Sequence, residues 1–409
     1  PQEQRELYDR SPYNIVRVEL GLGGEKDTPE DSRYTRAAAF LGRWVKEGVL
    51  VPEERPALYL THQLFRYGGK EHVRKGLMAL VKLEEFEEGG VRPHEETAQE
   101  AKRDRLELMQ ACRANISPIM ALYDEPGGGL AEAFASVGKR PPDVTGEVGE
   151  ETHHLWALTD EGAISTICSS LESLPLYIAD GHHRYETALK YRGLMKESQS
   201  PGWDDPPSNF VMMTLIDMSD PGLLCLPYHR LVRGIPPTTL RGLLQQSVRF
   251  FNVEQFSPPE GEAAADLFLQ GLQSRGSQEI VLGLFGVEEG KFHYLTLKDE
   301  RLVASLMPPN SSQAWQGLST SIVHKVLLKG LLGLDDVEVE KRGDISFLRD
   351  ALEAVRRVSD GEFQLAALVN AVSMAQLKGV ADGGERLPSK STHFYPKLPT
   401  GLVINSLDV

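Results

Sequence analysis

The chain has 409 residues, of which 41% are hydrophobic and 25% are charged, and 59 acidic against 44 basic side chains give a net charge of -15. This length is more than one compact core usually contains, so we expect two or three domains. Duplex nucleic acids are usually bound through a basic face, so the acidic balance predicts no nucleic-acid partner.

The three cysteines, Cys112, Cys168 and Cys225, lie far apart and form no CxxC pair. This argues against a disulfide framework and against a cysteine zinc site. The apolar stretch SIVHKVLLKGLLGL contains His324 and two lysines, so it is too short and too charged to cross a bilayer. We therefore expect a cytoplasmic protein that has no membrane partner.

The first half of the chain alternates between helical and extended patterns. Residues Asp31 to Gly48 have apolar side chains at helical spacing, with a possible cap at each end. Two strand-like runs follow, ALYLTHQLF and KGLMALVKLEEF, with a hairpin-like turn between them. The run AQEAKRDRLELMQACRAN predicts a helix, and ISPIMALYDE predicts a buried strand.

The alternation continues to the C-terminus. We expect strands at HHLWALTD, PLYIAD, FVMMTLIDM, LLCLPYHRL, EIVLGLFGV and KFHYLTLK, and mostly helix from Ser311 to Val380. The pattern predicts an α+β protein in three parts. Residues 1–235 form a mixed core, 236–310 a second α/β module, and 311–409 a helical segment with a tail that packs back on the core.

The stretch LPLYIADGHHRYETALKY predicts a strand that ends at Asp180 and a helix that begins at His182. Asp180 is suited to cap that helix, and Gly181 permits a tight turn and the close approach of a ligand. The first turn of a helix exposes unpaired N–H groups and favours anions. Placing His182, His183 and Arg184 there is costly unless an anion binds. We therefore predict a cradle for the phosphates of a nucleotide.

Two other interpretations of this motif remain open. In the first, Arg184 pairs with Glu186 or another acid and both histidines form structural hydrogen bonds. A metal site is the second, because His182 and Glu186 are four residues apart and share a helical face. Adjacent histidines, however, diverge by about 100° on a helix.

A second group of candidate residues precedes the helix predicted at AQEAKRDRLELMQACRAN. His94 and Glu95 fall in a loop, where catalytic groups are often found. A carboxylate there is suited to act as general base towards a hydroxyl group. The alternative is a solvated charge run, in which Glu95 and Glu96 only favour the helix dipole.

The C-terminal tail mixes basic and hydroxyl side chains, including Lys390, Ser391, Thr392 and Lys397. Such a mixture suits phosphate oxygens. A solubilising terminal segment is the alternative, although the nearby Tyr395 indicates that the tail packs on something.

Five phrases together resemble a large bacterial and archaeal family catalogued as domain of unknown function 1015. They are PHEETAQEAKRDRL, SPIMALYDEP, PLYIADGHHRYETAL, LPYHRLV and GERLPSKSTHFYPKLPTGLVIN. The resemblance covers essentially the whole chain, and the DGHHR and KSTxFYPKLxTGL phrases are its most specific parts. Family members usually open with a PPYDVI-like phrase, which is not found here. If that segment is absent, we expect part of the site to be missing.

The DGHHR phrase also resembles the nucleotide-binding box of the ParB/sulfiredoxin-like superfamily. That superfamily includes partition proteins that bind CTP, sulfiredoxin, and free serine kinases that use ADP or ATP. The resemblance implies a ParB/sulfiredoxin-like core with nucleotide phosphates at the start of the helix. It also implies ATP or ADP as cofactor with Mg²⁺, for which Asp180 and Glu186 are the candidate ligands.

Three functions are consistent with these features. The first is a phosphotransferase similar to a free serine kinase, in which Glu95 or His94 is the base towards a small substrate such as serine. The second is a nucleotide-binding regulator without catalysis. The third is a phosphoester hydrolase in which His182 or His183 performs acid–base chemistry. The region from Thr238 to Met307 has no assigned role.

Overall fold

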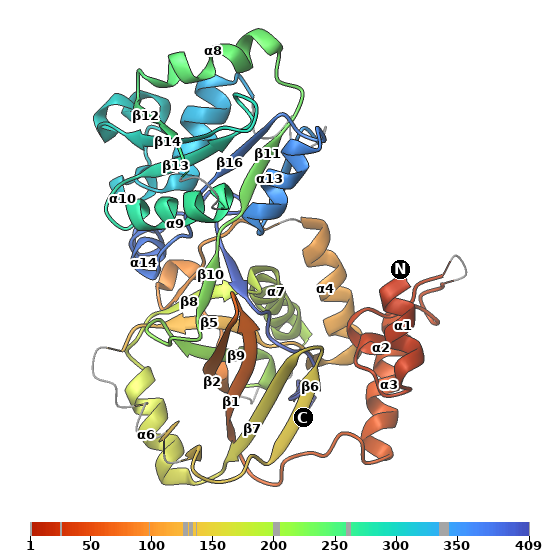
Figure 1. Cartoon of the computed structure of the whole chain (residues 1–409). Coiled ribbons are helices and arrows are strands. Elements are labelled where there is room, and N and C mark those ends of the chain that lie inside the picture. The colour runs from red at the N-terminus through yellow and green to blue at the C-terminus, as the bar shows by residue number, and fades with distance from the viewer. Residues whose placement is uncertain are drawn as a thin grey trace. The chain divides into compact units, whose positions relative to one another are not determined.

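The computed structural model describes residues 2–24, 27–97, 99–125, 130, 134–135, 137–198, 205–258, 263–334 and 343–408. The chain forms two compact units (Figure 1). Unit 1 comprises Pro1–Leu223 together with Pro396–Val409, and unit 2 comprises Leu224–Tyr395. Each unit contains helices and a main sheet, which confirms the expected mixed α+β class. The predicted division into three parts at residues 235 and 310 stays a prediction.

Unit 1 is built on a mixed eight-stranded sheet. Its order is β3 (Val91–Arg92), β8 (Leu176–Asp180), β5 (Ile119–Tyr123), β9 (Phe210–Asp217), β2 (Lys70–Lys82), β1 (Leu58–Tyr67), β7 (Glu151–Leu158) and β6 (Val144–Val148). The pairs β3–β8 and β5–β9 are parallel, and the other pairs are antiparallel. Two adjacent strands inside this sheet, β5 and β9, each have at least five buried residues. Both faces of these strands are covered, which explains why their sequences are continuous apolar runs.

The helices of unit 1 are α1 (Gln2–Arg10), α2 (Val16–Glu19), α3 (Arg33–Lys46), α4 (Gln99–Cys112), α6 (Glu161–Leu171) and α7 (His182–Ser198), with short 3₁₀ turns at Phe86–Glu88 and Pro207–Asn209. The helix expected from Asp31 is confirmed. It begins after Ser32, whose hydroxyl accepts a hydrogen bond from the Thr35 N–H, and Gly48 beyond its end has a φ of 72°. The last strand, β18 (Asn405–Ser406), pairs with β4 (Ala114–Asn115).

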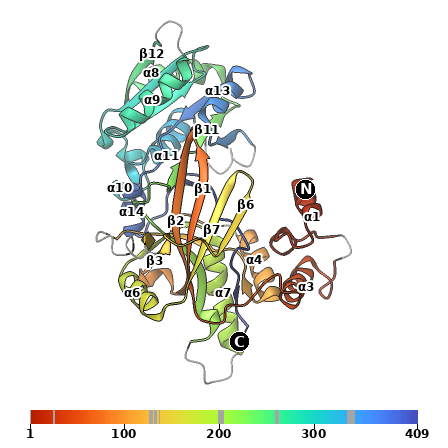
Figure 2. The ribbon, with the colours of Figure 1, turned by 60° about the horizontal axis from the view of Figure 1, so that its bottom comes forward.

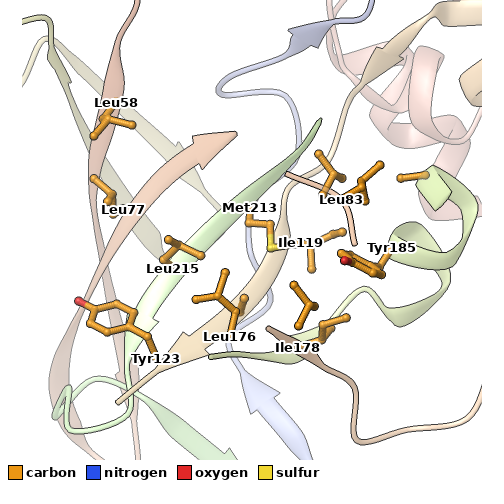
Figure 3. Close-up of a cluster of buried hydrophobic side chains, with 14 of the residues drawn as sticks. Leu58, Leu77, Leu83, Ile119, Tyr123, Leu176, Ile178, Tyr185, Met213 and Leu215 are labelled. Carbon is orange, nitrogen blue, oxygen red and sulfur yellow. The ribbon is translucent and has the colours of Figure 1, made fainter. Parts of the chain in front are cut away.

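A single apolar cluster holds α7 against the unit 1 sheet (Figure 3). Tyr185 of α7 is fully buried and lies near Ile119 and Ile178 of the sheet. The Tyr185 hydroxyl donates a hydrogen bond to the carbonyl of Glu84 at 2.8 Å. Because Tyr185 is only one turn from the start of α7, these contacts fix the position of that start beside the end of β8.

Unit 2 contains an antiparallel six-stranded sheet. Its order is β12 (Phe251–Phe256), β14 (Phe292–Leu297), β13 (Val281–Phe285), β16 (Leu365–Leu368), β11 (His229–Val232) and β15 (Ile345–Leu348). A separate pair joins β10 (Leu224–Leu226) to β17 (His393–Tyr395). Phe268 of α9 and Ala354 of α13 pack in the apolar cluster of this sheet. Figure 2 shows the ribbon of these two helices, α9 and α13.

The helices of unit 2 are α8 (Pro237–Ser247), α9 (Ala264–Gly276), α10 (Gln313–Gln316), α11 (Ser319–Ile322), a π-helix named η5 (Val323–Leu331), α13 (Ala351–Ser359) and α14 (Met374–Asp382), with 3₁₀ turns at Glu300–Leu302 and Ala304–Leu306. The expectation of mostly helix from Ser311 to Val380 needs a correction, because β15 and β16 lie within that range. In the described part of the chain, no helix is both long and apolar enough to cross a membrane.

Candidate functional site

The strand-to-helix turn predicted at Asp180 is confirmed. The strand β8 is buried up to Ala179, and α7 begins at His182. Between them Gly181 has a φ of 99°, in the left-handed region that favours glycine. A Cβ atom at Gly181 would lie 3.0 Å from the Arg184 Nε atom, so the absence of a side chain also lets the guanidinium fold back over the turn.

The structure brings the His94–Glu95 loop to the first turn of α7. A carboxylate oxygen of Glu95 lies 3.9 Å from Nδ1 of His182, and the Glu95 side chain is 45% exposed. On the other side of the ring, the backbone N–H of His94 donates to Nε2 of His182 at 3.3 Å. That bond makes Nε2 the acceptor, so the proton of a neutral His182 is on Nδ1, which faces Glu95.

The two candidate histidines of this group are both buried, whereas the carboxylate is not. His94 is 1% exposed, and its ring packs edge to face on that of His182 at 4.7 Å. His182 is 3% exposed. Glu95 is therefore the member of the group with substantial access to solvent, and the two histidines lie behind it.

A second link joins the same loop to α7. Glu186 accepts a hydrogen bond from the Thr97 hydroxyl at 2.8 Å, and it forms an ion pair with Nζ of Lys102 at 2.7 Å. These side chains come from the loop, from α4 and from α7. Burial, with Lys102 and Arg105 nearby, lowers the pKa of the neighbouring His183, an effect that the charge of Glu186 opposes.

Arg184 is bonded within unit 1. Its guanidinium forms an ion pair with Asp180 at 2.8 Å and donates to the carbonyl of Pro118. The second carboxylate oxygen of Asp180 meets Nζ of Lys397, which returns to unit 1 near the end of the chain. Asp180 thus compensates the charge of two of the cations that we expected to bind phosphate, and a phosphate has to compete with it for them.

Two residues that no sequence motif indicated, Arg74 and Gln63, hold the backbone around Lys397 in place. Arg74 of β2 is 2% exposed and donates to the side chain of Gln63 and, at 2.7 Å, to the carbonyl of Pro396. Gln63 donates to the carbonyl of Lys397 at 3.0 Å. Burial lowers the pKa of Arg74 to about 10. No local pattern predicts this group, because its partners are more than 300 residues apart in sequence.

A cavity of about 560 Å³ lies along α4 and α7, and its lining residues are Gln99, Glu100, Lys102, Arg103, Glu186, Thr187 and Lys190. This volume is within the range of small-molecule sites. In the described part of the chain, Lys190 forms no hydrogen bond or ion pair. The cavity therefore offers an uncommitted cation beside the Lys102–Glu186 pair.

The residues expected to hold Mg²⁺ are already bonded to cations, Asp180 to Arg184 and Lys397, and Glu186 to Lys102. Among the described residues, no group of three or more His, Cys, Asp and Glu side chains is arranged for a metal ion. The residues present therefore do not fit a metal site by themselves.

The tail residues divide between the two units. Lys390, Ser391 and Thr392 belong to unit 2, and Lys397 belongs to unit 1. Ser391 is 4% exposed, and its hydroxyl donates to the carbonyl of Pro388 at 2.6 Å. Its hydroxyl is thus used in the fold of unit 2.

The chain belongs to the family described as protein of unknown function (DUF1015), whose sequence profile matches residues 1–321. None of the curated proteins with which it was compared matches it. The family membership confirms the predicted resemblance to domain of unknown function 1015, and it assigns no activity.

Several solved structures are distantly similar to the chain. A mutant free serine kinase in complex with AMP is 15% identical with a TM-score of 0.38, covering 79% of this chain and 89% of that chain. A conserved hypothetical protein from Pyrococcus furiosus is 14% identical with a TM-score of 0.37, covering 81% and 95%. SbnI from Staphylococcus aureus, with a C-terminal truncation, is 13% identical with a TM-score of 0.37, covering 80% and 87%. Likenesses at this level do not establish a shared activity.

Proposed function

We propose that the start of α7 in unit 1, on a ParB/sulfiredoxin-like core, is the site of a nucleotide-dependent phosphotransferase that acts on a small hydroxyl substrate. The observation that carries this proposal is the position of Glu95, 3.9 Å from Nδ1 of His182 in the first turn of a long helix. A carboxylate oriented by a buried imidazole, next to a helix start that favours anions, combines a base with a phosphate site.

Glu95 is the proposed general base. It takes the proton from the acceptor hydroxyl as that oxygen bonds to the terminal phosphorus of the nucleotide. The bond from that phosphorus to the bridging oxygen breaks, and the shortened nucleotide leaves with the electron pair. His182 is a positioning residue, because its Nδ1–H faces Glu95 while its Nε2 is held by the backbone of His94. His94 is too buried to act as the base.

The phosphates are proposed to bind the backbone amides that follow Gly181, with Lys102 and Lys190 in the adjoining cavity. Phosphoryl transfer depends mainly on positioning and on neutralisation of phosphate charge. Arg184 and Lys397 contribute indirectly, because each is bonded to Asp180 and so fixes the turn.

Mg²⁺, if used, has to arrive with the nucleotide, since its candidate ligands Asp180 and Glu186 are bonded to cations. Mg²⁺ in such sites is commonly held by one or two carboxylates together with phosphate oxygens and water. The roles proposed for Glu95 and His182 do not depend on the metal.

The experiment that tests the proposal is incubation of the full chain with ATP or ADP, Mg²⁺ and serine, with phosphorus NMR to detect a new phosphomonoester. A product whose formation requires both nucleotide and serine supports a phosphotransferase. Nucleotide-dependent thermal stabilisation without product points instead to a regulator, and release of phosphate without serine points to a hydrolase. Either of the last two results contradicts the proposal.

A further inference from the structure

Two family phrases that the proposed site does not use meet in unit 2. The phrase LPYHRLV supplies β11 with its preceding turn, and KSTHFY supplies β17. The strands β10 and β17 pair antiparallel, with Leu226 opposite His393. The Tyr228 hydroxyl is 3.2 Å from Nδ1 of His393. The two phrases therefore form one polar cluster, separate from the residues assigned to Glu95.

The turn at Lys390 is held in an unfavourable backbone conformation. Lys390 has a φ of 56°, and among the described residues Arg113 is the other non-glycine residue with a positive φ. Glycine adopts this conformation without the steric cost that a lysine incurs. Residues held in such conformations are concentrated at functional sites, where the surrounding structure maintains them.

Buried groups maintain the Lys390 conformation. Arg230 is 0% exposed and donates to the carbonyl of Lys390 at 3.1 Å. The Ser391 hydroxyl bonds to the carbonyl of Pro388 at 2.6 Å and to the Thr320 hydroxyl at 3.1 Å. The turn is thus fixed on both sides of Lys390 by side chains whose positions the core determines.

Arg230 also bonds to a buried histidine. Arg230 donates to Nε2 of His324, on the π-helix η5, at 2.9 Å. Arginine has no acceptor atom, so Nε2 of His324 carries no proton and the imidazole is neutral. This acceptor carries no negative charge.

A second arginine is oriented in the same way. Arg349 donates to Nε2 of His393 at 2.8 Å, so the proton of this ring is on Nδ1 and is donated to the Tyr228 oxygen. The Lys390 ammonium lies 5.9 Å from the centroid of the Tyr228 ring. Lys390 and Arg349 are therefore the two ends of a chain of contacts through Tyr228 and His393.

The side chains of Lys390 and Arg349 are both exposed, and in the described part of the protein neither of them forms an ion pair. We propose that Lys390 and Arg349 form an anion-binding site in unit 2 that takes a phosphate group of a small molecule. A phosphate matches them because its several oxygens and double charge engage a guanidinium fork and an ammonium together. This site does not depend on the phosphotransfer assigned to Glu95.

The test is residue-specific labelling of the full chain with phenylglyoxal, followed by peptide mass spectrometry at increasing pyrophosphate. Arg349 is expected to be protected in a saturable way, with labelling slowed at least about tenfold. Arg249 is the matched control, since it is also exposed, lies over an aromatic ring and forms no ion pair in the described part of the chain. Equal labelling of Arg349 with and without pyrophosphate, or equal protection of Arg249, overturns the proposal.

The variant Lys390→Gly separates binding from folding. Glycine accepts the positive φ, so the melting temperature is expected to stay equal or rise, while the pyrophosphate needed to protect Arg349 increases at least about tenfold. Protection at an unchanged concentration overturns the role of Lys390. Repeating the titration with ADP and with O-phosphoserine tells a nucleotide ligand from a phosphomonoester by which of them protects at the lower concentration.

Discussion

The start of α7 in unit 1 and the Lys390 turn in unit 2 differ in the partners of their cationic side chains. In unit 1, Arg184 pairs with Asp180 and Lys102 pairs with Glu186, so the cations are compensated by carboxylates. In unit 2, Arg349 donates to an imidazole nitrogen of His393, which satisfies a hydrogen bond without removing the charge of the guanidinium. An anion entering the unit 1 site meets the amides of α7 and Lys190, and it must compete with a carboxylate for Arg184 or Lys102. An anion in unit 2 meets Lys390 and Arg349, which form no ion pair in the described part of the chain.

The largest effect is expected from Glu95→Gln, which tests whether the unit 1 site performs chemistry. Loss of a general base lowers kcat about 10²–10⁴-fold. Glu96→Gln is the matched control, because Glu96 is exposed in the same loop, and it is expected to leave kcat unchanged. The measurement is the rate of phosphomonoester formation, and equal kcat values for the two variants would remove Glu95 from the mechanism.

Protonation of His229 in unit 2 is expected to destabilise the fold, because it places a second positive charge beside Arg230. Burial, with Arg230 adjacent, lowers the pKa of His229 to about 4, against about 6.5 when unfolded. Between these values the unfolded chain binds the proton, so His229 contributes stability above pH 6.5 that is lost as the pH falls towards 4. The shift corresponds to about 3 kcal/mol.

Urea unfolding between pH 7 and pH 4 measures this loss. His229→Asn keeps an acceptor for the N–H of Val369, which bonds to Nδ1 of His229 at 3.2 Å, but it does not titrate. The variant should lose about 3 kcal/mol less than the parent over this interval. Parallel pH profiles for the two proteins would show that His229 does not titrate in this way.

Arg184→Ala sharpens the account of the compensated cations. The loss of its bonds to Asp180 and Pro118 is expected to lower the free energy of unfolding by about 2 kcal/mol, the scale of charge-assisted hydrogen bonds. Lys190→Ala, on the same helix and without an ion pair, should change it by less than about 0.5 kcal/mol. Full stability of Arg184→Ala with a weakened nucleotide Kd would instead support Arg184 as a phosphate ligand.

The smallest effect is expected for Lys397→Met. Lys397 is 49% exposed, and exposed ion pairs contribute less than about 1 kcal/mol. Urea unfolding measures the change in the free energy of unfolding. Lys378→Met in unit 2 is measured beside it, to compare the loss of a lysine outside unit 1. A loss of several kcal/mol at Lys397 would show that its pair with Asp180, rather than the backbone bonds from Arg74 and Gln63, holds the returning chain.

Local features of the site were predictable from the sequence. The apolar run predicts the end of β8, and Gly181 predicts the turn because it tolerates a positive φ. Helical spacing from Tyr185 onward predicts the start of α7. The pairing of two family phrases was not predictable. His94 and Glu95 are nearly 90 residues from His182, and only the fold brings them together.

Other features escaped prediction for definite physical reasons. The four residues of β16 are all buried and apolar, so no periodicity distinguishes that strand from a helix. Lys390 and Lys397 are close in sequence but belong to different units, because the chain returns to unit 1 at Pro396. The buried Arg74 has partners across the chain that no local pattern indicates.

Hydrogen–deuterium exchange of the full chain with and without Mg²⁺-ADP is the most direct test of the central claim, that nucleotide phosphates bind the amides after Gly181. The account predicts slower exchange at saturating nucleotide in peptides covering residues 181–187 and 99–103. Unchanged exchange in both segments, while ADP binds elsewhere or does not bind, would contradict it.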